Sequence, residues 1–118
     1  MATNETMTKD ILMHHLTAFG NNDLDEIMQD YTEQSEVLTQ NGLLKGLEAI
    51  REFFEQFFVT IPTGSEFEMK QLIITENVAY IAWSSKSAVA EIPMGTDTFF
   101  FEQDKIRFHT VASYILGK

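Results

Sequence analysis

The sequence contains no cysteine among its 118 residues. This absence excludes disulfide bonds, thiol nucleophiles and thiolate metal ligands, and it fits a reducing compartment. The first twenty residues also lack an apolar run long enough for a signal peptide or a membrane span, because Asp10, His14 and His15 interrupt them. We therefore expect a soluble protein located in the cytoplasm.

Basic residues are scarce as well. Eight Lys and Arg against eighteen Asp and Glu give a formal net charge of −10. A chain of this charge repels the phosphates of nucleic acids and of anionic lipids, so we expect neither as a partner. Apolar residues make up 44% of the chain, which is enough for a sizeable core. The length predicts a single domain over residues 1–118, with residues 1–7 frayed.

Apolar periodicity places helices before strands. A spacing of about 3.6 residues predicts helices over residues 8–19, 24–31 and 47–59, the first two capped by Thr8 and Asp23. Alternation and turn residues predict strands, listed here by range: 36–39, 66–76, 78–89, 96–101 and 105–116. Pro93-Met94-Gly95 is the predicted break before the last two strands. This order predicts an α+β domain, with helices on one face of a mostly antiparallel sheet.

Asp97 is the candidate functional residue in this pattern. It shares a strand face with Phe99 and Phe101, because residues two apart in a strand point to the same side. Asp97 therefore either faces an interior cavity or caps the strand at its solvent end. Burial would raise the pKa of its carboxyl group, which could then serve as a neutral hydrogen-bond donor or as a general base. A partly exposed Asp bonded to local backbone is the alternative.

The predicted hairpin brings His109 close to Asp97. A turn at residues 103–104 puts Asp97 opposite Thr110, one residue from His109. Adjacent residues of a strand point to opposite faces, so His109 shares the face of Asp97 only if a bulge intervenes.

Three segments carry a family resemblance. They are Ala18-Phe19 with Asp23-Leu24, the pattern Gly-x-x-x-Gly-x-x-x-Ile-Arg-x-Phe-Phe over residues 42–54, and Gly95-Thr96-Asp97-Thr98-Phe99 leading into Lys105-Ile106. Together they resemble the NTF2-like superfamily, in particular its SnoaL-like and ketosteroid-isomerase-like members. The resemblance implies a cone-shaped, cystatin-like fold, with three N-terminal helices packed on a strongly curved, mostly antiparallel sheet. It also implies an apolar pocket at the wide end and a homodimer formed through the sheet.

The same resemblance assigns roles to two positions. Asp97 matches the protonated Asp of the isomerase oxyanion hole, whereas the general base of those enzymes aligns with about Thr39. Threonine cannot accept a proton at neutral pH, and the first helix offers no tyrosine to complete the oxyanion hole. Steroid isomerase chemistry is therefore disfavoured, although folds of this kind host many other activities.

Two functions stay open at this point. The first is binding of a small apolar or aromatic molecule, with isomerase-, cyclase- or dehydratase-type proton transfer through Asp97 and no metal or organic cofactor. The second is a non-catalytic dimerisation or association domain. A cavity of roughly 300 Å³ or more at Asp97 would distinguish the first from the second.

Further side chains are candidates for the pocket wall, and each could instead belong to the core. They are Phe19, Tyr31, Thr39, Phe57, Trp83, Met94, Phe99, Tyr114, His14 and His109. Adjacent helical residues lie about 100° apart, so His14 and His15 cannot face one metal ion. No metal site is expected.

Overall fold

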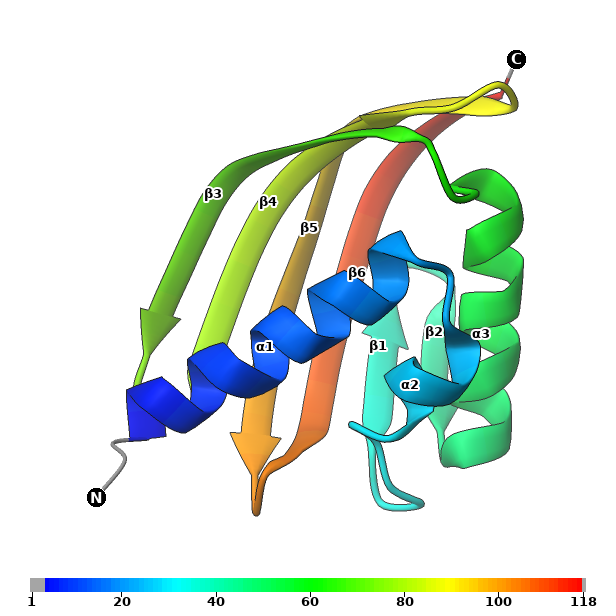
Figure 1. Cartoon of the computed structure of the whole chain (residues 1–118). Helices are drawn as coiled ribbons and strands as arrows, with labels where there is room; N and C mark the ends of the chain where they lie inside the picture. Colours follow the sequence, from blue (N-terminus) through cyan, green and yellow to red (C-terminus); the bar gives the residue numbers. More distant parts are fainter. Residues whose placement is uncertain (1–3, 118) are drawn as a thin grey trace.

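The computed structural model describes residues 4–117 and consists of three helices and a six-stranded curved sheet (Figure 1). The helices are α1 (Asn4–Gly20), α2 (Leu24–Met28) and α3 (Leu47–Thr60). The strands are β1 (Glu36–Thr39), β2 (Gly42–Lys45), β3 (Glu66–Thr75), β4 (Val78–Lys86), β5 (Ala90–Glu102) and β6 (Lys105–Gly117). The predicted α+β class is confirmed, and only the short strand β2 was missing from the sequence prediction.

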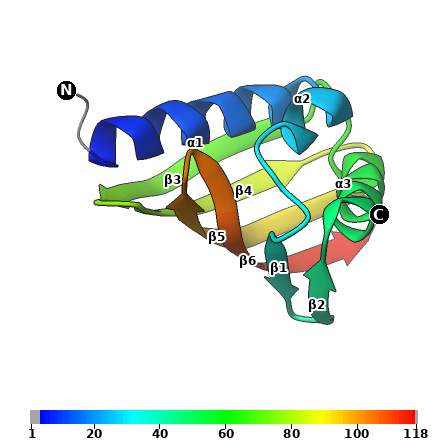
Figure 2. The ribbon, with the colours of Figure 1, turned by 90° about the horizontal axis from the view of Figure 1, so that it is seen from below.

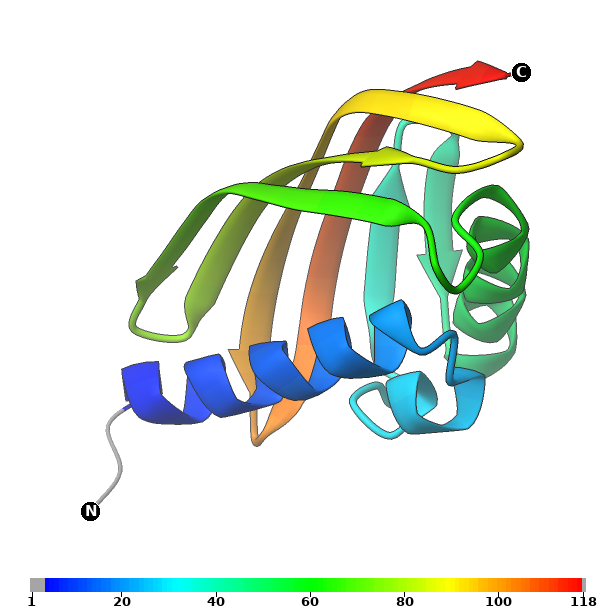
Figure 3. The same cartoon turned by 45° about the horizontal axis from the view of Figure 1, so that its top comes forward.

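The strand order is β2-β1-β6-β5-β4-β3, and every pair is antiparallel except β1 with β6. The sheet curves strongly without closing. The three helices gather on its concave side, where α1 crosses the long strands and α3 lies beside β2 (Figure 2). The far ends of β3, β4 and β5 bend over toward α3 (Figure 3). No helix within residues 4–117 has the length and apolarity needed to cross a membrane.

The core lies between α1 and the concave face of the sheet. The buried residues of α1 recur every three or four positions, so one side of the helix faces the strands. Fully buried apolar side chains from all parts of the fold meet it there: Leu12, Ile27, Val37, Ile50, Phe54, Ile81, Phe99 and Ile106. Because His15 follows Leu12 by three residues, it lies on the same buried side.

Helix α1 begins earlier than predicted. Thr8 is not its N-cap but a buried residue of its second turn, and the Thr8 hydroxyl donates a 2.8 Å hydrogen bond to the carbonyl oxygen of Glu76. The carboxylate of Glu5 accepts from the backbone N–H of Glu76 at 3.1 Å. These contacts hold the first turns against the β3–β4 turn, so residues 4–7 are helical and not frayed. Residues 1–3 of the predicted frayed segment lie outside the described residues.

The predicted cap of α2 is confirmed, because a carboxylate oxygen of Asp23 accepts from the backbone N–H of Glu26 at 3.3 Å. The predicted break at residues 93–95 is wrong, because β5 runs through it. Its pairing shifts register there against both β4 and β6. Proline lacks the N–H that a sheet ladder needs, so it is tolerated at such a bulge, where the strand can bend.

Candidate functional site

A one-residue bulge at Arg107 sets the register of the β5–β6 hairpin. The pairing of the two strands skips this residue, although the turn at residues 103–104 lies where the sequence predicts it. Asp97 consequently pairs with Val111, and not with Thr110 as the turn alone predicts. His109 therefore faces the same side of the sheet as Asp97. This bulge is the one that the sequence analysis required for the two side chains to share a face.

Four polar side chains form a buried hydrogen-bonded chain on this face. The hydroxyl of Tyr31 lies 2.8 Å from Nδ1 of His109, and Nε2 of His109 lies 3.1 Å from Oδ2 of Asp97. The indole N–H of Trp83 donates to Oδ1 of Asp97 at 3.3 Å. All groups are paired when Tyr31 donates to Nδ1 and the Nε2–H of His109 donates to Asp97. With these donors, both oxygens of Asp97 accept hydrogen bonds.

Burial keeps Tyr31 and His15 neutral. Desolvation, reinforced by Asp97 and Asp30, raises the pKa of Tyr31 well above its usual range, so its hydroxyl keeps its proton. Desolvation also lowers the pKa of His15 well below 6.5, with smaller contributions from His109 and His14. Nδ1 of His15 has no hydrogen-bond partner among the described residues.

The space beside Asp97 is small. The cavity that it lines has a volume of about 20 Å³, which suits one water molecule. His15 and His109 also line this cavity, among aromatic side chains that include Phe54 and Trp83. The side chain of Asp97 is 13% exposed. The interior at Asp97 is thus packed, well below the roughly 300 Å³ set as the distinguishing size, and by that criterion it favours the non-catalytic association domain over chemistry at Asp97.

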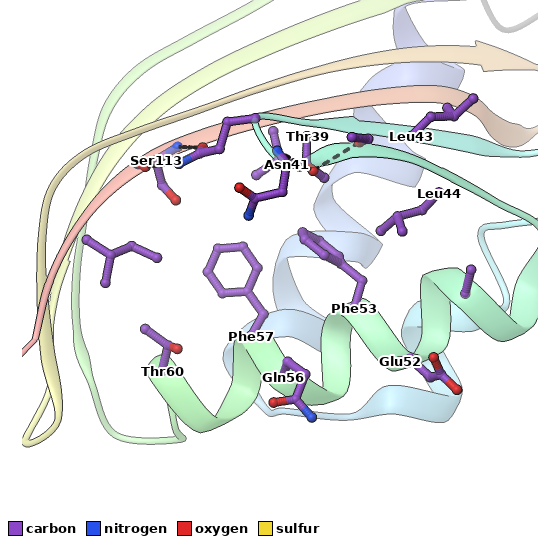
Figure 4. A pocket seen from close by; sticks show the side chains of 15 residues that line it. Thr39, Asn41, Leu43, Leu44, Glu52, Phe53, Gln56, Phe57, Thr60 and Ser113 are labelled. Atoms are coloured by element: carbon purple, nitrogen blue, oxygen red, sulfur yellow. Dashed lines mark hydrogen bonds between the residues drawn. The ribbon is translucent and has the colours of Figure 1, made fainter.

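A larger pocket lies directly beside it, between α3 and the strands β1, β2 and β6 (Figure 4). Its volume is about 490 Å³. Figure 4 shows the rings of Phe53 and Phe57 rising from α3 toward the strands. Leucine, isoleucine and valine side chains complete the apolar wall, and polar groups come from Thr39, Gln40, Asn41, Glu52, Gln56, Thr60 and Ser113. Phe53, Phe57 and Val111 line both spaces, so a single layer of side chains separates the pocket from the cavity at Asp97.

Nine of the ten predicted pocket residues fall into three groups. Phe19, Phe57, Trp83 and His109 line the small cavity with Asp97, and Thr39 lines the large pocket with Phe57. Tyr31 and Phe99 are buried next to His109, with which both make ring contacts. Met94 and Tyr114 are 50% and 65% exposed, and they line neither space.

His14 lies apart from both spaces. Its Nδ1 is 2.7 Å from a carboxylate oxygen of Asp30, and its Nε2 is 3.1 Å from one of Glu26. The hydrogen bonds to Asp30 and Glu26 raise the pKa of His14, and through them the ring joins α1 to the segment around α2. No group of three or more His, Asp or Glu within residues 4–117 is arranged to hold a metal ion.

The sequence prediction missed His15, Phe53 and Val111 as cavity-lining residues. Helical spacing contains a signal for His15, because it lies three residues after Leu12 and four before Phe19 on one helix face. Phe53 and Val111 carry no such signal, since a core residue and a pocket residue have the same apolar pattern.

The SnoaL-like domain family matches residues 12–109, and no protein of curated function matches the chain by sequence. A solved NTF2-like protein of unknown function from Mesorhizobium loti superposes with a TM-score of 0.79 at 12% identity, over 97% of this chain and 96% of that one. A SnoaL-like protein of unknown function from Burkholderia thailandensis gives a TM-score of 0.72 at 16% identity, over 92% and 94%.

An enzyme is also among the similar structures. The epoxide hydrolase/cyclase-like enzyme SalBIII, of pyran ring formation in polyether salinomycin, gives a TM-score of 0.75 at 18% identity, over 91% of this chain and 90% of that one. At such identities these structures share the NTF2-like fold and show nothing more. The family match, in contrast, spans most of the sequence, including Asp97 and His109. The chain therefore belongs to the SnoaL-like domain family.

Proposed function

We propose that this chain binds a small, mainly apolar molecule in the pocket between α3 and the strands β1, β2 and β6. The observation that carries the proposal is the pocket itself, whose volume of about 490 Å³ lies within the usual range for small-molecule sites. Phenylalanine and aliphatic side chains form most of its wall, with several amides and hydroxyls and the carboxylate of Glu52 among them. Such a wall suits an aromatic or alicyclic compound that carries one or two polar groups.

A substitution that fills the pocket tests this binding. Ala49 lines the pocket from α3, so Ala49→Phe places a ring in the space that the ligand would occupy. Titration calorimetry with the bicyclic ketone 2-tetralone should show an affinity at least about tenfold lower for this variant than for the wild type. Val59→Phe is the matched control, because Val59 lies on the same helix, is 67% exposed and does not line the pocket. Equal affinity of Ala49→Phe and the control would contradict the proposal.

Proton transfer through Asp97 is the second part of the proposal. Its support is the hydrogen-bonded chain of Tyr31, His109 and Asp97, which ends one side-chain layer away from the pocket. Because the interior at Asp97 is packed, this step requires the layer of Phe53, Phe57 and Val111 to move so that a ligand in the pocket reaches Asp97. The Asp97 carboxylate would then act as a base in isomerase-, cyclase- or dehydratase-type chemistry, without a cofactor. The fold shared with a cyclase-like enzyme is consistent with this class.

Hydrogen exchange on a ketone measures this activity directly. Protein-catalysed exchange of the α-protons of 2-tetralone in D₂O, followed by NMR, should fall about a hundredfold in Asp97→Asn. The exposed turn residue Asp104 provides the control, since Asp104→Asn leaves the hydrogen-bonded chain intact. Exchange that is no faster than in buffer, or that is unchanged in Asp97→Asn, would leave the non-catalytic association domain as the better account.

A homodimer through the convex face of the sheet completes the proposal. The outward side chains in the middle of β5 and β6 are mostly uncharged, although the chain carries a net charge of −10, and Arg107 borders them with its guanidinium 4.2 Å from the centre of the Phe108 ring. This surface consists of Met94, Thr96, Thr98, Phe100, Phe108, Thr110, Ala112 and Tyr114. A mostly uncharged, partly aromatic face suits a second copy of the same chain, because association there brings few like charges together.

Light scattering tests the dimer. The wild type should have twice the monomer mass of 13.5 kDa, and Tyr114→Asp should have the monomer mass, because it places a carboxylate within the uncharged face. Val59→Asp, on the helical side of the molecule, should leave the dimer intact. A wild type that is monomeric at every concentration would refute this part.

The charge and composition extend the proposal to partners and location. We expect no binding to nucleic acids or membranes, because a net charge of −10 repels both. The cytoplasm stays the predicted location, since a chain without cysteine needs no oxidising compartment.

A further inference from the structure

His15 is a buried polar residue that the hydrogen-bonded chain does not use. Its side chain is 2% exposed, and its Nδ1 has no hydrogen-bond partner among the described residues. A buried nitrogen without a partner costs about 1–3 kcal/mol, so such an atom is usually paired with something. The rings of Phe99, Phe54 and His109 surround His15 with centroids at 5.1, 5.7 and 5.8 Å, and none of them pairs with Nδ1.

The cavity that His15 lines has room for one hydrogen-bond partner of Nδ1. Its volume of about 20 Å³ holds one water molecule or one oxygen-bearing group and nothing larger. Asp97 and His109 line the same cavity, so the site offers several polar groups to a single occupant. Burial also makes an anionic occupant unfavourable, because a negative charge would be placed in a space shielded from solvent.

The position of the cavity connects it with the large pocket. Phe53, Phe57 and Val111 form a wall common to both spaces. A ligand with its apolar body in the pocket therefore needs to displace only this layer for a terminal oxygen to reach His15. Because burial holds the pKa of His15 well below its usual value, the ring is neutral and pairs with a neutral group.

We propose that the space beside His15 is a binding site for one neutral oxygen atom, occupied by water in the free protein and by the hydroxyl or carbonyl oxygen of the ligand in the complex. The ligand half of this statement rests on the proposed function, whereas the water half does not. His15 thereby selects compounds with a neutral oxygen at one end over hydrocarbons and over carboxylates.

The free protein provides the first test. A high-resolution crystal structure of the wild type should show a water molecule within hydrogen-bonding distance, about 3 Å, of Nδ1 of His15. The same position should hold no water molecule in His15→Phe or in His15→Leu, because both variants replace the imidazole by an apolar side chain that forms no hydrogen bond. An empty cavity in the wild type would overturn the water half, and this observation needs no variant to fold.

A series of three probes of one shape tests the ligand half. Tetralin, 2-tetralol and 2-tetralone differ only in the oxygen substituent, and one hydrogen bond of ordinary strength makes a difference of about fivefold in affinity. The wild type should bind the alcohol or the ketone about fivefold more tightly than tetralin, and His15→Phe should bind all three equally. A preference that persists in His15→Phe and His15→Leu would overturn the ligand half.

The crystal structure of the free protein and the probe series together distinguish a failure of this inference from a failure of the proposed function. A water molecule at His15, together with no binding of any probe in the large pocket, would support the oxygen site and reject the proposed ligand binding. Binding of tetralin as tightly as of 2-tetralol and 2-tetralone to the wild type would support the pocket and reject the role of His15.

Discussion

Replacing Phe54 by alanine is expected to lower the free energy of unfolding by about 4 kcal/mol. Phe54 is 2% exposed and lies where α3 meets the core. Its ring makes contacts with His15, Tyr31 and His109, with centroid separations of 5.7, 5.8 and 6.4 Å. Truncation therefore removes a large buried apolar surface and leaves a cavity among side chains that cannot all move inward.

Chemical denaturation measures this loss. Val59→Ala on the same helix is the control, because a side chain that is 67% exposed should change the free energy of unfolding by less than about 0.5 kcal/mol. The Phe54→Ala cavity would also loosen the packing around the Tyr31–His109 hydrogen bond, so exchange of the hydroxyl proton of Tyr31 should become faster. A loss below about 1 kcal/mol would show that the core is not packed as described.

Gly95→Ala is the second substitution with a large expected effect, about 3 kcal/mol of destabilisation. A Cβ atom at this position would lie 2.4 and 2.5 Å from Cζ2 and Cε2 of Trp83, closer than any real contact. The indole cannot move freely, because Phe67 stacks on it at 5.5 Å and its N–H donates to Asp97. The added methyl therefore forces either the strand or the indole away from its place.

A double-substitution cycle identifies the cause of that loss. If the clash with Trp83 is the reason, Gly95→Ala should cost much less in a Trp83→Leu background than in the wild type. Gly20→Ala is a useful comparison, since a Cβ there would meet no atom within 4 Å. Equal costs of Gly95→Ala in the two backgrounds would attribute the loss to the backbone and not to the indole.

Local patterns predicted most of the secondary structure. Apolar periodicity placed α3, and the alternation around Phe99 placed the last hairpin, because both signals depend on residues close together in the chain. The start of α1 was missed because Thr8 and Glu5 bind the turn at Glu76, about seventy residues away. Contacts of that kind leave no trace in a local pattern.

The candidate site was harder to predict than the fold. Asp97 stood out as a carboxylate in an apolar strand, yet its approach to His109 depends on the bulge at Arg107. The bulge accompanies contacts of Arg107 with Glu36 and with the carbonyl oxygen of Gln34, which come from a different part of the chain. The separation of a large pocket from a small polar cavity depends on individual ring positions, which helical periodicity does not specify.

A crystal structure of the protein soaked with 2-tetralone tests the central claim most directly. The account predicts the bicyclic body between α3 and β6, against Phe53 and Phe57, with the ketone oxygen directed toward His15. A ligand bound elsewhere, or a pocket without ligand at saturating concentration, would contradict the claim that this space is a small-molecule site.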